Sequence, residues 1–305
     1  MSNVKDSNPN FKENTWEESS YCVEFAIFNV KLTVITFIFS LGAFFWTQLI
    51  DSPPCSSLGC AVGCHTIVFV VILIFGKLMF DLRRFEVIWR ASVIGTFFSM
   101  GLWLSTNSDI LSSFGFYLCT LSFFHVSEYL ATGLTNPSNL KTDSFLLNHS
   151  LQYWIAAMAS WTEYFIELYF VGPDMKNYAT IRTTGFILCL IGEFIRKTAM
   201  FHAGQSFSHI VQNTKQSDHV LVQDGIFSLV RHPSYVGWML WSVGTQILLA
   251  NPVCLCAYTY VTWAFFNERI YIEEYSLLQF FGEDYKKYQD RVAVGIPFIK
   301  GYMHR

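Results

Sequence analysis

The residues with the clearest chemical potential lie in the last third of the chain. Residues 201–282 contain a polar segment with the run Arg231-His-Pro-Ser-Tyr235, and an apolar run that ends near Arg269, Glu273 and Glu274. Arg269 and Glu273 are four residues apart, so they share one face of a helix. An arginine and a carboxylate at a membrane boundary are costly unless they pair or bind a ligand. This group is therefore the first candidate for a binding site.

The run Arg231-His-Pro-Ser-Tyr235 predicts the start of a helix. Pro233 is suited to the first helical position, and Gly237 permits close packing against a neighbouring helix. The backbone N–H groups that follow are expected to be unpaired and to form a site for an anion. His232 is a candidate contact for a ligand, although a single histidine is more often structural.

With these motifs, the segments His219-Val-Leu-Val222, Gly225-Ile-Phe227 and Glu273-Glu274 resemble the C-terminal signature of the isoprenylcysteine carboxyl methyltransferase family. The match covers roughly residues 202–301. The resemblance implies an enzyme that uses S-adenosylmethionine to methylate the terminal carboxylate of a farnesylated or geranylgeranylated cysteine. The implied partners are CaaX-processed proteins such as small GTPases and the lipid bilayer, with no nucleic acid, and the implied compartment is the endoplasmic reticulum.

The resemblance also implies roles for individual residues. Arg269 is the expected catalytic and substrate-binding residue, because a guanidinium can hold a carboxylate through two parallel hydrogen bonds. The alternative is that Arg269 extends to the interface and pairs with Glu273. The expected cofactor-binding residues are Gln212, His219, Val220, Leu221, Val222, Phe227, His232, Pro233, Ser234, Tyr235 and Glu273.

Two of these cofactor positions have alternatives. Relatives often have Tyr where this chain has Phe227, so a hydrogen bond from that position is not expected here. Glu273 is preferred to Glu274 because it shares a helix face with Arg269, but both carboxylates remain candidates.

Methylation of a carboxylate makes few demands on the protein. The nucleophile has an unperturbed pKa near ~3.5, so it is ionised at neutral pH and needs no general base. Positioning of the two reactants can supply about 7–11 kcal/mol of the lowered barrier. The absence of a catalytic triad motif is consistent with this chemistry, and no glycine-rich dinucleotide fingerprint follows a strand.

Three other functions share part of the pattern. A phospholipid N-methyltransferase would use the same cofactor but has no use for Arg269, because its acceptor is an amine. A sterol reductase would use a nicotinamide cofactor. A non-catalytic receptor for prenylated tails would retain the fold with a degenerate site, which the intact His232, Tyr235 and Arg269 argue against.

The elements that must position these residues are membrane helices. The chain has 305 residues, of which 52% are hydrophobic and 14% charged, and this composition excludes an ordinary soluble domain. A span needs about 20 apolar residues. The sequence therefore predicts an all-α integral membrane protein with about eight spans, at 28–50, 61–80, 87–105, 110–134, 146–171, 180–200, 235–250 and 252–267, and a cytosolic-facing C-terminal cofactor pocket.

The distribution of Lys and Arg predicts the orientation. Among the short loops at 51–60, 106–109, 172–179 and 251, only Lys176 is basic, whereas the opposite loops and the C-terminal tail are rich in Lys and Arg. Basic loops stay in the cytosol, so both termini are expected there. We expect one integral membrane domain over 1–305: a mobile cytosolic arm at 1–27, six helices over 28–200, and the signature region 201–305 with a helical hairpin at 235–267.

The sequence leaves other questions open. Cys55, Cys60 and Cys64 could form a disulfide if their loop is lumenal, but their spacing does not suit zinc. Six ionisable residues within the spans either order the bundle, which we favour, or act in function. A di-iron site is not expected, since paired Glu-x-x-His motifs are missing; the six residues are His125, Glu128, Glu163, Glu167, Glu193 and Arg196.

Overall fold

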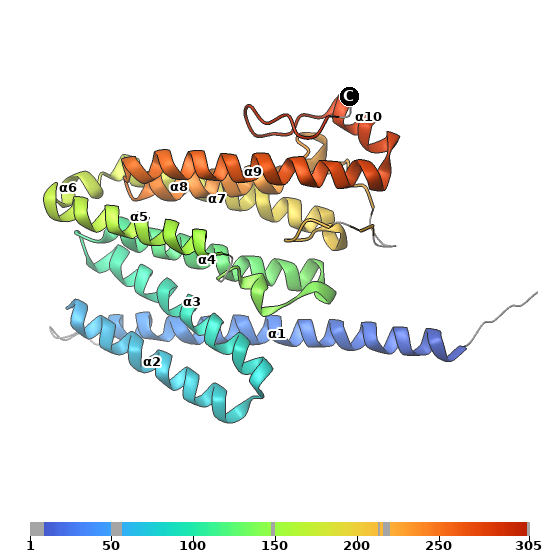
Figure 1. The fold of residues 1–305 in the computed structure, drawn as a ribbon. Helices are drawn as coiled ribbons and strands as arrows, with labels where there is room; N and C mark the ends of the chain where they lie inside the picture. Colours follow the sequence, from blue (N-terminus) through green and yellow to red (C-terminus); the bar gives the residue numbers. More distant parts are fainter. Residues whose placement is uncertain (1–8, 50–56, 148–149, 213, 216–219, 304–305) are drawn as a thin grey trace, which may run out of the picture.

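The structure is a computed structural model that describes residues 9–49, 57–147, 150–212, 214–215 and 220–303, with side chains from Cys22 onward. Over these ranges it consists of helices without strands (Figure 1). The α-helices are α1 (Pro9–Leu49), α2 (Leu58–Met79), α3 (Leu82–Asn107), α4 (Ser112–Thr135), α5 (Leu151–Phe170), α6 (Pro173–Lys176), α7 (Ala179–Ala203), α8 (Pro233–Leu248), α9 (Pro252–Phe281) and α10 (Glu283–Arg291). Short 3₁₀ turns are η2 (Pro137–Asn139), η3 (Thr142–Phe145), η4 (Gly204–Ser206) and η5 (Gly225–Ser228).

Each of the eight predicted spans corresponds to a helix, α1 to α5 and α7 to α9. Within the described residues, four segments are long and apolar enough to cross a membrane by length and composition: Cys22–Leu49, Leu58–Met79, Leu82–Asn107 and Pro173–Ser206. The other four predicted spans correspond to helices that do not meet both conditions; α8, for example, has 16 residues. The number of spans therefore stays a prediction, whereas the all-helical class is confirmed.

Two helices are longer than their predicted spans. Helix α1 begins at Pro9 rather than near residue 28, and α9 continues to Phe281 instead of ending near residue 267. Neither extension contains a glycine, and the only proline is Pro9, the first residue of α1. The Glu, Lys and Leu residues in the extensions favour helix. Polarity therefore indicated where a span would end, but the helix continues until a residue such as Gly282 stops it, at φ 52°.

The helices lie in two groups that meet at α4. Helices α1, α2 and α3 pack together beside α4, and α7 and α8 pack against each other on the far side, with α9 along α8 (Figure 1). A Cβ atom on Gly237 would lie 2.5 Å from the carbonyl oxygen of Gly192, so only glycine fits there. This confirms the close helix packing expected at Gly237.

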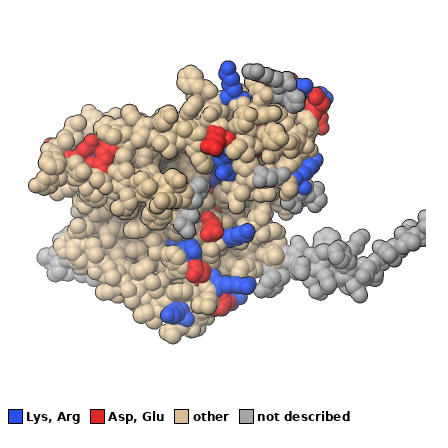
Figure 2. Space-filling view, in the orientation of Figure 1, with Lys and Arg blue, Asp and Glu red and all other residues tan. Residues whose placement is uncertain are grey.

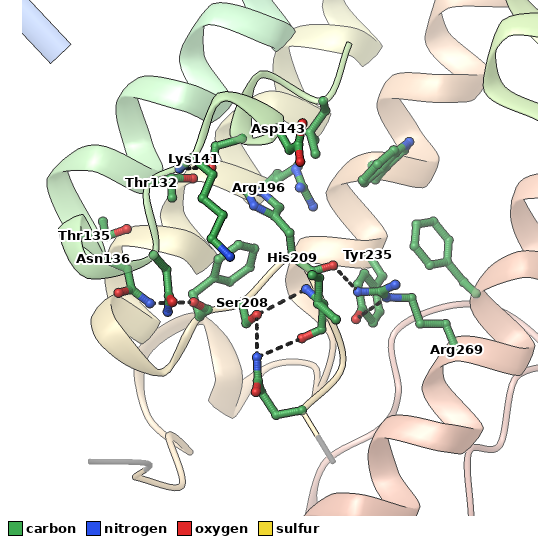
Figure 3. Close-up of a pocket in the computed structure, with 18 of the residues that line it drawn as sticks. Thr132, Thr135, Asn136, Lys141, Asp143, Arg196, Ser208, His209, Tyr235 and Arg269 are labelled. Carbon is green, nitrogen blue, oxygen red and sulfur yellow. Dashed lines mark hydrogen bonds between the residues drawn. The ribbon is translucent and has the colours of Figure 1, made fainter. Parts of the chain in front are cut away.

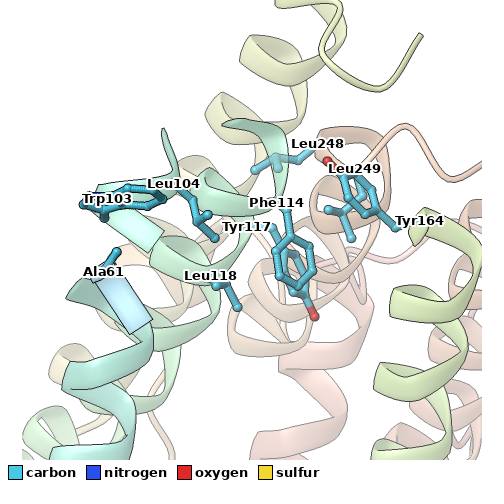
Figure 4. Close-up of a cluster of buried hydrophobic side chains, with 9 residues drawn as sticks. All are labelled: Ala61, Trp103, Leu104, Phe114, Tyr117, Leu118, Tyr164, Leu248 and Leu249. Carbon is cyan, nitrogen blue, oxygen red and sulfur yellow. The ribbon is translucent and has the colours of Figure 1, made fainter. Parts of the chain in front are cut away.

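A buried apolar cluster joins the two groups at the end of the molecule away from the sequence motifs (Figure 4). Its aromatic centre is Phe114, whose ring centroid lies 5.4 Å from that of Tyr164 and 5.8 Å from that of Tyr117. Leu248 and Leu249 at the end of α8 complete it. In a membrane-spanning bundle such a cluster contributes through close van der Waals packing between helices.

The motifs lie at the opposite end. The α2–α3 turn, the segments 136–147, 204–212 and 220–232, and α10 with the residues that follow it to 303 are at one end of the helices, and the connections α3–α4 and α8–α9 are at the other (Figure 1). Most of the charged side chains visible in Figure 2 gather toward the motif-bearing end. The alternation of helix directions therefore brings distant polar segments together.

Several polar residues within the predicted spans order the bundle, as expected. Glu163 accepts hydrogen bonds from the backbone N–H groups of Val253 (2.7 Å) and Cys254 (2.6 Å), which caps the start of α9. Lys176 pairs with Glu167 and donates to the carbonyl of Ala250 at 2.9 Å. His125 lies 2.8 Å from the carbonyl oxygen of Phe145. These contacts satisfy helix ends that would otherwise have unpaired groups.

The cysteine cluster is partly resolved. Cys60 is disulfide-bonded, whereas Cys64 takes no part in a disulfide. Cys55 lies outside the described residues. Within the described residues, no three His, Cys, Asp or Glu side chains are grouped as metal ligands would be.

Candidate active site

A cavity of about 490 Å³ opens between α4, α7, α8 and α9 and residues 204 to 212, which we call the loop 204–212. Its wall combines Thr132 and Asn136 of α4 with Arg196 of α7, His209 of the loop, and the pair Tyr235 and Arg269 (Figure 3). Of the predicted site residues, Gln212, Tyr235 and Arg269 are brought together here. We call this cavity the polar pocket.

Arg269 is held by two protein groups on one side of its guanidinium. Its Nε donates to the Tyr235 hydroxyl at 2.9 Å, and its Nη2 donates to the carbonyl oxygen of His209 at 2.5 Å. A guanidinium has five N–H donors. The remaining donors have no hydrogen-bond acceptor among the described residues. Arg269 is therefore fixed in orientation while one edge of its fork stays available.

The predicted pairing of Arg269 with Glu273 is indirect. Across the described residues there is no ion pair between them, although both lie on α9 four residues apart. The Tyr235 hydroxyl accepts from Arg269 Nε and donates to Glu273 Oε2, so it bridges the two. Helical spacing places the two side chains on one face, but the tyrosine from α8 enters between them.

The two neighbouring carboxylates have different environments. Glu273 is half-buried and faces a smaller cavity of about 90 Å³. Glu274 is fully buried and accepts from Arg231 Nε (2.8 Å), Gln289 Nε2 (3.0 Å) and the backbone N–H of Tyr302 (2.9 Å). Burial raises the pKa of Glu274, but the hydrogen bonds and charges of His232 and Arg231 outweigh burial and lower it. Glu274 is therefore an anion that the protein itself satisfies.

His232 belongs to the environment of Glu274 more than to the polar pocket. Its Nε2 lies 3.1 Å from Glu274 Oε1, and its ring stacks on Tyr235 with centroids 5.5 Å apart. Arg231 donates to the carbonyl oxygen of Gln289 at 3.2 Å. Arg231 thus ties α10 to the start of α8, and His232 supports one face of the Tyr235 ring.

The start of α8 is more fully paired than the sequence predicts. The N–H groups of Tyr235 and Val236, which were expected to be free, both donate to the carbonyl oxygen of His232 at 3.1 Å. Ser234 Oγ accepts from Arg196 Nη1 at 2.7 Å, and Pro233 is buried. The expectation of an open anion site at these two N–H groups is therefore wrong, because the chain supplies its own acceptor.

The remaining predicted cofactor residues separate into two places. Gln212 and Val220 line the small cavity with Glu273, and this cavity shares Ser208, Ile210 and Gln212 with the polar pocket. Leu221 packs beneath α10, and the carbonyl oxygen of Phe227 accepts from Tyr288 at 2.6 Å. Val222 is half-buried and is not in a strand, and His219 lies outside the described residues.

A second large cavity is almost entirely apolar. It has a volume of about 450 Å³ and lies between α4, α5, α8 and α9. It shares Trp238, Phe265 and Phe266 with the polar pocket, so the two cavities meet at one aromatic wall. We call it the apolar groove. Its far part is lined by Tyr117 and Thr245.

Most residues that line the polar pocket were not predicted from the sequence, and His209 and Asn136 are two of them. His209 lies in a polar loop with no motif of its own, and Asn136 follows an unremarkable helix end. His209 Nε2 lies 2.8 Å from Glu128 Oε2, and Asn136 donates to the carbonyl oxygens of Gln205 (3.0 Å) and Phe207 (3.1 Å). The available signal was Glu128, a carboxylate within a predicted span that needed a partner.

Residues 185–279 of the chain match the model of the isoprenylcysteine carboxyl methyltransferase (ICMT) family. The chain is 49% identical to the protein-S-isoprenylcysteine O-methyltransferase of Xenopus laevis over 246 residues, which cover 80% of this chain and 85% of the relative. It is 47% identical to the Homo sapiens protein of the same name, covering 73% and 78% of the two chains.

A solved structure has the same fold. It is described as the eukaryotic intramembrane Ras methyltransferase ICMT without a monobody. The TM-score is 0.87 at 42% sequence identity, and the match covers 90% of this chain and 99% of the solved one. The similarity therefore extends over the first helices, where the sequence carried no motif.

Proposed function

The chain belongs to the isoprenylcysteine carboxyl methyltransferase family, and we propose that it binds the α-carboxylate of a prenylated cysteine at Arg269 and methylates it with S-adenosylmethionine. It is an all-helical, multi-pass membrane protein and a protein-S-isoprenylcysteine O-methyltransferase, as its close relatives are. The methyl donor and the residue roles are the parts that we propose.

The observation that carries the proposal is the junction of a polar pocket with an apolar groove. A prenylcysteine has an anionic carboxylate at one end and a long hydrocarbon at the other. Arg269 lies on the polar side, and Trp238, Phe265 and Phe266 form the wall common to both cavities. A carboxylate at Arg269 would leave the prenyl chain next to the groove. Within a bilayer, the groove would hold that chain by close van der Waals packing rather than by removing it from water.

Arg269 suits the carboxylate because its orientation is already set. Tyr235 and the His209 carbonyl hold one side of the guanidinium, and the donors that remain can form the paired hydrogen bonds that carboxylates prefer. Less side-chain freedom is lost on binding when the group is held in advance. Arg269 would act by holding and orienting the substrate, and no proton need be removed.

The residues around Glu273 fit a cationic cofactor. S-adenosylmethionine supplies an electrophilic methyl group on a sulfonium. Glu273 is half-buried, lines the small cavity with Gln212 and Val220, and is bridged to Arg269 by Tyr235. A carboxylate in that position can pair with an ammonium group or a ribose diol. Glu274 is less suited, because its oxygens already accept from four protein donors.

The orientation in the membrane is part of the proposal. We place the motif-bearing end and both termini in the cytosol and the protein in the endoplasmic reticulum, with about eight spans in one integral domain and with CaaX-processed small GTPases as substrates. The disulfide at Cys60, at the start of α2 and so at the opposite end of the helices, supports a lumenal position for that opposite end, since disulfides persist in oxidising compartments. Glycosylation acceptor tags placed in the loops 51–60 and 172–179 should be modified. Modification of a tag in 135–145 would contradict the proposed orientation.

The activity is tested with purified protein and radiolabelled S-adenosylmethionine. A farnesyl-cysteine analogue and phosphatidylethanolamine are offered in separate reactions. We expect label in a base-labile methyl ester of the first and none in the second. Label in the phospholipid alone would replace the carboxylate acceptor by an amine and remove the proposed role of Arg269.

A further inference from the structure

We propose that His209 and Asn136 are positioning residues, which hold the loop 204–212 where its backbone orients Arg269 toward the substrate carboxylate. The inference rests on the proposed role of Arg269 and adds the reason why that arginine has the correct geometry. The structure offers a continuous series of contacts from α4 through the loop to α9.

The contact that matters for Arg269 is with a backbone atom. Arg269 Nη2 donates to the carbonyl oxygen of His209 at 2.5 Å, and among the described residues the guanidinium forms one other hydrogen bond, to the Tyr235 hydroxyl. A carbonyl group cannot be removed by substitution, and its position depends on whatever holds the loop. Side chains that anchor the loop therefore control the orientation of the guanidinium.

Two side chains tie the loop to α4. The His209 ring lies 2.8 Å from Glu128 Oε2, and Glu128 is itself held by the buried Arg196 at 2.6 and 2.7 Å. Asn136, which is buried at the end of α4, donates to the carbonyl oxygens of Gln205 and Phe207. One anchor thus holds the start of the loop and the other holds the residue whose carbonyl contacts Arg269.

The loop has no regular structure beyond the turn η4 (Gly204–Ser206). Because both anchors hold it, its backbone can still serve as a fixed hydrogen-bond acceptor for Arg269. Buried Glu128 and Arg196 form a rigid support, because breaking such a pair leaves an uncompensated charge. Displacement of a reacting group by about 1 Å can cost on the order of 100-fold in rate. Loss of one anchor should therefore lower methylation without removing Arg269.

The first test substitutes His209. We expect His209→Ala to lower kcat/KM for a farnesyl-cysteine analogue about 10-fold, mainly through the KM of that analogue, with the unfolding temperature within error of wild type. The change in S-adenosylmethionine affinity by calorimetry should be smaller than the change in KM, because only part of the loop lines the small cavity. His209→Gln should recover most of the loss, since its amide N–H can reach Glu128. His202→Ala is the matched control, because His202 contacts Asp224 outside the polar pocket, at 3.1 Å, and should leave all values unchanged.

The second variant covers the case in which His209→Ala does not fold. Asn136→Asp keeps the size of the side chain but removes both donors to the loop. We expect the same direction of change in KM, about 5-fold, with a smaller change in cofactor affinity. Wild-type KM in folded Asn136→Asp and His209→Ala would overturn the proposal.

A double-mutant cycle separates this inference from the proposed function. If His209 acts through Arg269, His209→Ala should change kcat/KM less than about 2-fold in an Arg269→Lys background, since residues in one network are not additive. Fully additive losses would overturn the positioning role alone. Wild-type activity of Arg269→Lys would instead overturn the proposed role of Arg269 itself.

Discussion

Two buried carboxylates, Glu128 of α4 and Glu274 of α9, have similar surroundings but organise different parts of the molecule. Each is fully buried and paired with an arginine, at 2.6 Å for Arg196–Glu128 and 2.8 Å for Arg231–Glu274. The other donors to Glu128 come from α7 and the loop 204–212, whereas those to Glu274 come from α8 and the C-terminal tail.

The difference is in what each cluster supports. Arg196 and His209, which bind Glu128, also line the polar pocket, but Arg231 and His232, which bind Glu274, do not. Arg269, Tyr235 and Glu273 lie between the two clusters. A buried ion pair near a site can therefore form the wall of that site or can hold a distant segment in place. The residue types of the pair do not show which of the two it does.

The largest expected effect is on stability, and it tests the role of the Glu128 cluster. Glu128→Ala leaves the buried Arg196 without its carboxylate, whereas Lys197 keeps Glu193 as a partner. Removing one partner of a buried pair costs about 3–5 kcal/mol. We expect a marked fall in unfolding temperature in lipid nanodiscs, whereas Glu283→Ala, which removes an exposed pair with Lys286, should leave it unchanged. Equal behaviour of the two variants would contradict the structural role of Glu128.

The next effect is on turnover. Arg269→Lys keeps the charge but cannot form two parallel hydrogen bonds with a carboxylate. Loss of a charge-assisted bond of about 1.5–3 kcal/mol should reduce kcat/KM for a farnesyl-cysteine analogue by about 10- to 150-fold. Cofactor affinity measured alongside should survive better. If Arg269 only extends to the membrane interface, lysine would serve equally and turnover would stay near wild type.

Substitution of the two adjacent glutamates sharpens the comparison. Glu273→Gln should weaken S-adenosylmethionine binding by about 1.5–3 kcal/mol while the unfolding temperature is retained. Glu274→Gln should instead lower the unfolding temperature, because Arg231 and His232 lose a buried anion. Calorimetric binding and thermal unfolding of both variants separate the two roles. Unchanged affinity in Glu273→Gln would move the cofactor to other residues.

The smallest effect is expected at the bridge between the clusters. Tyr235→Phe removes the hydroxyl that links Arg269 to Glu273 and keeps the ring that stacks on His232. A single hydrogen bond contributes about 0.5–1.5 kcal/mol, so we expect a 2- to 15-fold fall in kcat/KM. Steady-state kinetics with either reactant varied would reveal it, and Tyr169→Phe, at an exposed tyrosine of α5 that lines neither large cavity, serves for scale. A loss beyond 100-fold would mean that the hydroxyl does more than orient Arg269.

The sequence by itself determined the class of fold, the family and most of the helices. Composition required a bilayer as solvent, and runs of apolar residues marked the helical segments because a span must be long and greasy. Motif residues such as Arg231 and Glu273 indicated the family. These properties are local, and each can be inferred from a short window of the chain.

Only the tertiary structure decided which polar groups meet. The sequence places Arg269 and Glu273 on one face, but Tyr235 from α8 separates them, and His209 reaches Glu128 from a loop 81 residues away. Glu273 and Glu274 are neighbours in sequence, yet successive residues on a helix point in directions about 100° apart, so one lines a cavity and the other is enclosed. Hydrogen-bond partners across helices depend on packing angles and loop paths, which no local pattern encodes.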